Sequence, residues 1–186
     1  MQAATLEGGF ADVPRDGARA FRQIMNAMAR PGVIADVDGA AAPAPMSVAA
    51  GVVLLTLCDP ETPIYLSPAC DTAEVRAWIT FHTGAPICAA ADAQFALGPW
   101  DELPKDDFAI GTSEYPDRSV TLIVEHPDLQ AQGAVLQGPG IKDQAALNLP
   151  ETGAFQANAA LFPRGLDFIF TCQRRLAALP RTTKVS

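Results

Sequence analysis

Apolar residues recur at helical spacing near the start of the chain, within residues 15–29. They fall at positions i, i+3, i+4 and i+7, with arginines on the other side, which predicts an amphipathic helix that stops at Pro31-Gly32. The four side chains expected to face the core are Phe21, Ile24, Met25 and Met28.

The rest of the chain alternates between short apolar runs and turn signals. Three further helices are predicted: residues 48–57 with Ser47 as N-cap, a helix that starts at an Asp71/Glu74 capping box and ends at Gly84, and residues 154–161 capped by Thr152. Strands are predicted over residues 33–37, 64–66, 87–90, 95–97, 119–125, 134–137 and 166–172. The run 119–125 is rich in β-branched residues, and 134–137 is expected to be its partner. Intermixed helices and strands favour an α/β fold with a mixed sheet.

Composition limits the class of protein. The chain has 186 residues, of which 49% are hydrophobic and 18% charged, so disorder is excluded and a single domain over residues 1–186 is expected. The longest apolar run, 48–57, is about half of what a membrane span needs. The net charge of −8 argues against a general nucleic-acid partner. We expect an extended lead-in over residues 1–14 and a basic C-terminal tail over 173–186.

Cysteine usage and the N-terminus indicate the compartment. None of the four cysteines forms a CxxC pair, and the two histidines do not stand at zinc-ligand spacing from them, so no metal site is expected. The first ten residues have neither a basic nor an apolar region of a secretory signal. We therefore expect a cytoplasmic protein with reduced thiols.

The familiar catalytic motifs are missing from the sequence. There is no GxxxxGK[ST] loop and no GxSxG elbow, and the proline of the Gly138–Lys142 turn removes a donor that a phosphate site would use. The three lysines stand in acidic or polar contexts, which argues against a covalent pyridoxal enzyme, and no cofactor is expected. His82, near the end of a predicted helix, suits packing or capping, with catalysis as the alternative.

Two segments carry the candidate binding chemistry. The loop with Glu114, Tyr115 and Arg118 is either a ligand or partner loop or a turn satisfied by its own charges. Residues 164–186 hold five basic residues and one acidic residue, which suits an acidic partner, an anionic ligand or the protein's own acidic body.

Eight motifs in order resemble one family. They are GF at 9–10, FRQIMNAMARPG at 21–32, DPETP at 59–63, FHTGAP at 81–86, GTSEYPDRS at 111–119, GPGI at 138–141, FPRGLD at 162–167 and LPRTT at 179–183. Together they resemble PhnH, a subunit of the bacterial carbon–phosphorus lyase system, over nearly the whole chain.

The resemblance implies both a fold and a role. The fold would be a single-domain, three-layer mixed sheet between helices, like the large domain of pyridoxal-phosphate-dependent transferases but without the cofactor. The family acts with G, I and L subunits in making α-D-ribose 1-methylphosphonate 5-triphosphate from ATP and methylphosphonate, and it sits in a core complex of G, H, I and J subunits. Isolated members form homodimers. The resemblance carries no catalytic residue to this chain.

Three functional hypotheses follow from the sequence. The first is a non-catalytic scaffold subunit of the lyase complex. The second is a subunit with its own phosphonate or nucleotide cleft, for which guanidinium groups are suited. Its candidate residues are Arg30, His82, Arg118, Arg181, Thr182 and Thr183. The third is an independent enzyme, such as a hydrolase with a dispersed triad.

Overall fold

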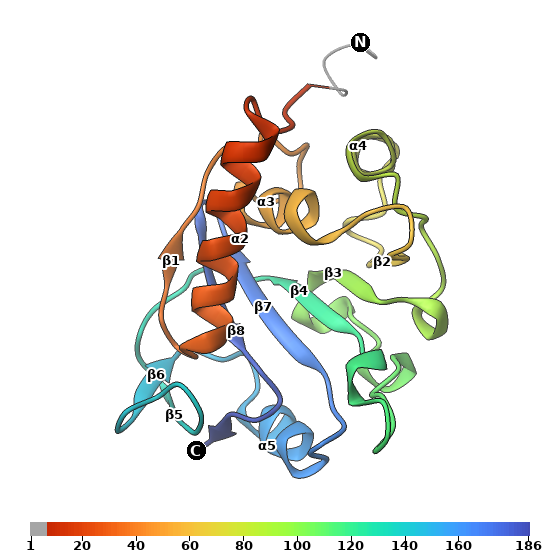
Figure 1. Ribbon diagram of the computed structural model, residues 1–186. Helices are drawn as coiled ribbons and strands as arrows, with labels where there is room; N and C mark the ends of the chain where they lie inside the picture. Colours follow the sequence, from red (N-terminus) through yellow and green to blue (C-terminus); the bar gives the residue numbers. More distant parts are fainter. Residues whose placement is uncertain (1–6) are drawn as a thin grey trace.

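A six-stranded mixed sheet forms the centre of the computed structural model, which describes residues 7–186 (Figure 1). The strands lie in the order β1-β8-β7-β4-β3-β2. Their bounds are β1 Ala35–Asp36, β2 Ile64–Leu66, β3 Phe95–Pro99, β4 Thr121–Glu125, β7 Asp167–Cys172 and β8 Arg175–Leu179. Strands β2, β3, β4 and β7 run parallel, while β8 is antiparallel to both β7 and β1.

The prediction that residues 134–137 pair with the strand at 119–125 is wrong. Strand β4 lies between β3 and β7, and both of its faces are buried. Leu122 and Val124 enter one core cluster, and Ile123 enters the cluster on the opposite face. A continuous apolar run of this kind is typical of a central strand in a parallel sheet, whose neighbours come from distant parts of the chain.

Helices cover both faces of the sheet, so the expected α/β class with a mixed sheet is confirmed. The helices are α2 Val13–Ala29, α3 Val48–Leu57, α4 Ala73–Thr83 and α5 Thr152–Ala160. Residues of α2, α3 and α4 contribute to one core cluster, whereas Phe155 of α5 belongs to the other, and Figure 1 shows α5 on the opposite side from α3. Within residues 7–186, no helix is both long and apolar enough to cross a membrane.

Helix ends follow the predictions only in part. Ser47 caps α3 as expected, by accepting a hydrogen bond from the backbone N–H of Ala50. The cap of α4, however, is Thr72, because Asp71 instead pairs with Arg76. The fourth helix begins at Thr152 itself rather than behind it. Capping side chains are frequent at such turns, and the sequence does not say which of two neighbours has the required geometry.

Two of the predicted strands differ from the structure. Residues 87–90 contribute a single bridge, Ile64 with Ile87, and then a short 3-10 turn, η1 Ala90–Asp92. The segment 134–137 forms β5 in a second sheet of order β6-β5-β9. The bounds of this antiparallel sheet are β5 Ala134–Gln137, β6 Ala145–Leu147 and β9 Lys184–Val185.

The ends of the chain are more structured than the sequence suggests. Residues 173–186, expected to be a tail, supply β8 at the interior of the large sheet and β9 in the small one. The expected lead-in, 1–14, lies partly outside the described residues, and its last two residues begin α2.

Helix α2 buries only part of the predicted face, since Ile24 and Met28 reach the core but Phe21 and Met25 do not. Ala20, Ile24 and Ala27 face the core, and this small-residue face lets the helix approach α3 and β8 closely. Phe21 and Met25, expected inside, remain 51% and 49% exposed. The apolar side of the helix is therefore wider than the surface it covers.

Candidate functional site

The loop that carries Glu114, Tyr115 and Arg118 lies before β4, at the amino ends of the parallel strands. It contains the 3-10 turn η4 Pro116–Arg118 and closes on itself, since the backbone N–H of Tyr115 donates to Thr112 Oγ1 at 2.9 Å. A hydroxyl that caps a turn in this way restricts the backbone of the loop.

The side chain of Arg181 connects this loop to the large sheet. Its guanidinium pairs with the carboxylate of Asp167 at the start of β7, and it donates to the backbone oxygen of Pro116 at 2.6 Å and to Ser119 Oγ. The side chains of Arg181 and Asp167 are only 12% and 17% exposed. The donors of Arg181 are thus engaged within the protein, and the residue positions the loop.

Arg118 and Tyr115 lie together on the exposed side of the loop. The guanidinium carbon of Arg118 is 4.1 Å from the centre of the Tyr115 ring, a cation–π geometry. Arg118 also borders a hollow of about 580 Å³, together with the carboxylates of Asp92 and Asp117. Two carboxylates beside one guanidinium do not favour a multiply charged anion there. Glu114 is exposed on the same loop.

Arg30, Thr182 and Thr183 surround the turn Gly138–Gly140, on the side of the small sheet. A methyl group on Gly138 would lie 3.2 Å from the backbone oxygen of Thr182. A methyl group on Gly140 would overlap the backbone oxygen of Ala29, the residue before Arg30. Thr182 borders an apolar hollow of about 270 Å³. Thr183 is buried, and its Oγ1 has no hydrogen-bond partner in the described part of the chain.

His82 lies apart from both groups, in the last turn of α4. Its ring centre is 4.8 Å from that of Trp78 and 5.0 Å from that of Phe81, and its Nε2 is buried without a partner among residues 7–186. These contacts describe an imidazole that is packed between aromatic side chains. His82 is therefore separate from the other predicted site residues, whereas Arg181 connects the loop with the second group, because it borders the same hollow as Thr182.

An apolar hollow, also of about 580 Å³, was not predicted from the sequence. It lies between α5 and the segment 100–110, and its walls include Trp100, Phe108 and Phe168. Trp100 Nε1 donates to Glu151 Oε2 at 3.2 Å, and Lys105 Nζ lies 4.3 Å above the Trp100 ring. A tryptophan inside an acidic stretch was the available signal, because such a ring is normally buried.

The sequence also did not predict the partly buried carboxyl group of Glu125, which lies at the carboxyl ends of the parallel strands. Glu125, the last residue of β4, accepts a hydrogen bond from the backbone N–H of Ser47 at 2.7 Å. Burial raises the pKa of Glu125 above its usual value, and the hydrogen bond from Ser47 only partly offsets this. Glu125 thus stabilises the first turn of α3.

Replacing Glu125 with glutamine should change how stability depends on pH. The raised pKa means that the folded state holds the proton more tightly than the unfolded state. The contribution of the Glu125 carboxyl to the free energy of unfolding is therefore present in full below the unfolded-state pKa of about 4.3. This contribution is lost as pH rises through the folded-state pKa. The variant lacks this loss, so its free energy of unfolding relative to wild type should increase with pH and then level off.

Urea denaturation at intervals from about pH 4 to about pH 8 measures this difference. Glu114→Gln, which removes an exposed carboxyl, is the control. A free energy of unfolding of Glu125→Gln that, relative to wild type, stays constant or falls as pH rises would contradict the assignment.

The Cys58 and Cys70 thiols stay protonated at neutral pH. Burial raises the pKa of Cys58 to about 12 and that of Cys70 to about 11. All four cysteines are free, and in the part of the chain that the structure describes no three His, Cys, Asp or Glu side chains are grouped to hold a metal ion.

These features define an α/β protein with several hollows and a surface loop that is held by Arg181. Comparison with known proteins identifies the family. The bacterial phosphonate metabolism protein family, PhnH, matches residues 8–186, and the chain belongs to this family.

Two relatives span almost the full chain. The chain is 43% identical over 196 aligned positions to the α-D-ribose 1-methylphosphonate 5-triphosphate synthase subunit PhnH of Rhizobium meliloti, covering 99% of this chain and 97% of that protein. It is 28% identical over 204 positions to the putative C-P lyase subunit protein HtxG of Stutzerimonas stutzeri, covering 100% and 94%.

Proposed function

We propose that this chain is an accessory, non-catalytic subunit of a carbon–phosphorus lyase assembly, in which it supports α-D-ribose 1-methylphosphonate 5-triphosphate synthesis. The observation that carries the proposal is the end-to-end similarity to a synthase subunit, at 43% identity. The packed His82 and the raised pKa values of the Cys58 and Cys70 thiols support a role without chemistry of its own.

The family resemblance extends the proposal to specific partners. They would be the G-, I-, J- and L-type subunits of the same system, in the cytoplasm, with a homodimer formed by the isolated chain. The likeness to the large domain of pyridoxal-phosphate-dependent transferases remains a prediction of the same resemblance.

The candidate residues take different parts in this proposal. Tyr115 and Arg118, exposed on a loop that Arg181 holds in place, are suited to contact a partner. Arg181 itself positions that loop. The acidic surroundings of Arg118 favour a protein contact over the alternative of a triphosphate or phosphonate cleft.

Deleting the gene in its host should abolish growth on methylphosphonate as the sole phosphorus source. Growth on phosphate should be unaffected, and the reintroduced gene should restore growth on methylphosphonate. Undiminished growth of the deleted strain on methylphosphonate would contradict the proposed function.

A further inference from the structure

Helix α2 leaves large apolar side chains at the surface. Phe21 and Met25 are about half exposed, although a phenylalanine and a methionine are normally found inside. Both stand one turn apart on the outer side of the helix, while Ala20 and Ile24 face the core. Exposed large apolar side chains that adjoin one another mark a surface that is covered in the working protein.

The exposed apolar residues form a continuous strip along the helix. Ala18 precedes Phe21 by three residues and Ala29 follows Met25 by four, and all four are exposed. At 3.6 residues per turn these positions share one side of α2, over a length of about 17 Å. We call this set the α2 strip.

Positive charge borders the strip on one side. Arg15 and Arg22, seven residues apart, are both exposed and lie along the edge away from the core. Arg22 makes no ion pair within residues 7–186, and Arg15 contributes only a loose pair with Asp12, at 3.9 Å. In a chain of net charge −8, Arg22 is thus an unpaired positive charge beside an apolar surface, and Arg15 is only loosely paired.

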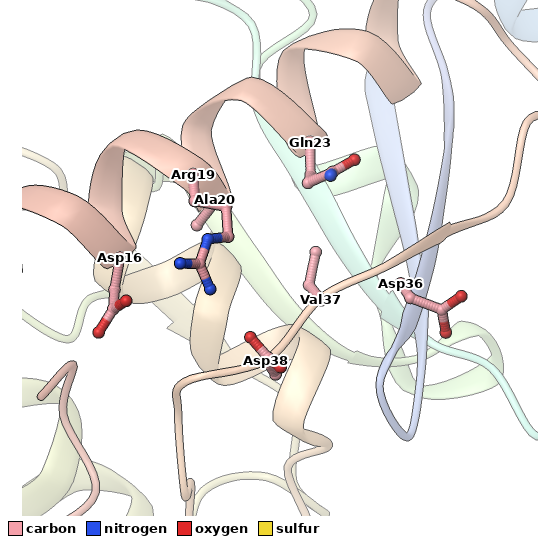
Figure 2. A pocket seen from close by; sticks show the side chains of 7 residues that line it. All are labelled: Asp16, Arg19, Ala20, Gln23, Asp36, Val37 and Asp38. Carbon is pink, nitrogen blue, oxygen red and sulfur yellow. The ribbon is translucent and has the colours of Figure 1, made fainter.

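Arg19, on the same helix, lies beside carboxylates of this chain, although it makes no ion pair within residues 7–186. Figure 2 shows it reaching from α2 toward the segment that carries Asp38, in a small hollow that Asp16 and Asp36 also border. Its charge faces carboxylates of the same chain. Arg22 is not among the residues that border this hollow and is exposed, so its guanidinium is available to a partner.

We infer that the α2 strip docks another subunit, through a surface whose apolar centre is flanked by carboxylates. The inference rests on the proposed function, since it names the face that an assembly subunit would use. Carboxylates opposite Arg15 and Arg22 would supply the charge complementarity that orients such a contact.

A second copy of this chain fits the strip less well. Two α2 helices packed antiparallel about a two-fold axis bring the same flank of each helix together, which would set Arg15 and Arg22 of one copy against those of the other. Like charges in such positions oppose association. The charge pattern therefore selects a different, acidic partner.

The test compares variants of the full chain co-expressed with the G-, I- and J-type subunits, one of them tagged. The double variant Phe21→Ser, Met25→Ser should lower the affinity for the complex at least about tenfold, because it removes the centre of the contact. Arg22→Glu should have a similar effect, whereas Arg22→Lys should keep most of the binding. The matched control is Phe81→Ser on α4, which removes a side chain that is 59% exposed and should leave binding within about twofold.

The outcomes separate the two proposals. All variants should unfold at the wild-type temperature, since the altered side chains are largely outside the core. A double variant that binds like wild type would overturn the docking surface and leave the proposed function intact. A double variant that loses only self-association would assign the strip to a second copy instead. A wild-type chain that binds none of the subunits would overturn both proposals.

Discussion

Replacing Arg181 with methionine is expected to lower the free energy of unfolding by about 3–5 kcal/mol. The guanidinium is largely buried and connects three parts of the chain: Asp167 at the start of β7, Pro116 in the loop, and Ser119 just before β4. Methionine fills much of the space but removes the charged partner of the Asp167 carboxylate, which keeps only the hydrogen bond from the backbone N–H of residue 181. A largely buried charge without a counter-charge is strongly destabilising.

Urea denaturation at neutral pH measures the effect. Arg118→Met is the matched control, because it removes an exposed guanidinium from the same loop and should change the free energy of unfolding by less than about 1 kcal/mol. Equal losses for the two variants would show that Arg181 does not hold the loop as described.

Replacing Gly140 with alanine is expected to lower the free energy of unfolding by about 3 kcal/mol or more. Gly140 has a φ of +82°, in the left-handed region that favours glycine. An added methyl group would also stand 1.9 Å from the backbone oxygen of Ala29, at the end of α2. The turn would have to move away from the helix, which breaks the contact between α2 and the small sheet.

Gly153→Ala is the control for this substitution. Gly153 lies within α5, and a methyl group there would meet nothing within 4 Å. Because alanine favours a helix over glycine, the control should be neutral or more stable by up to about 1 kcal/mol. A Gly140→Ala protein as stable as wild type would contradict the close approach of this turn to α2.

Local signals allowed much of the secondary structure to be predicted. The strand β2 and the helix α3 have the predicted bounds, because an apolar run between strong turn or capping signals defines both ends. The failures concern relations between distant segments. Strand β5 follows β4 along the chain, yet it joins another sheet, because β7 is the parallel neighbour of β4. The paired residues Thr121 and Asp167 are 46 positions apart, and no local pattern reveals such a pairing.

The same limit explains what was missed at the candidate site. Sequence motifs identified the loop with Tyr115 and Arg118 and singled out Arg181, but they could not show that Arg181 is engaged by Asp167. The hollow beside Trp100 is built from segments about 50 residues apart, as the contact of Trp100 with Glu151 illustrates. Periodicity predicted an apolar side of α2 correctly, and only the packing revealed that part of it stays uncovered.

The central claim is that this chain works as a subunit of a carbon–phosphorus lyase assembly. Native mass spectrometry after co-expression with the G-, I- and J-type subunits of its host tests that claim most directly. The account predicts a single assembly whose mass includes this chain in a fixed ratio to the other subunits. An assembly that forms without this chain, while the chain is recovered folded and alone, would contradict it.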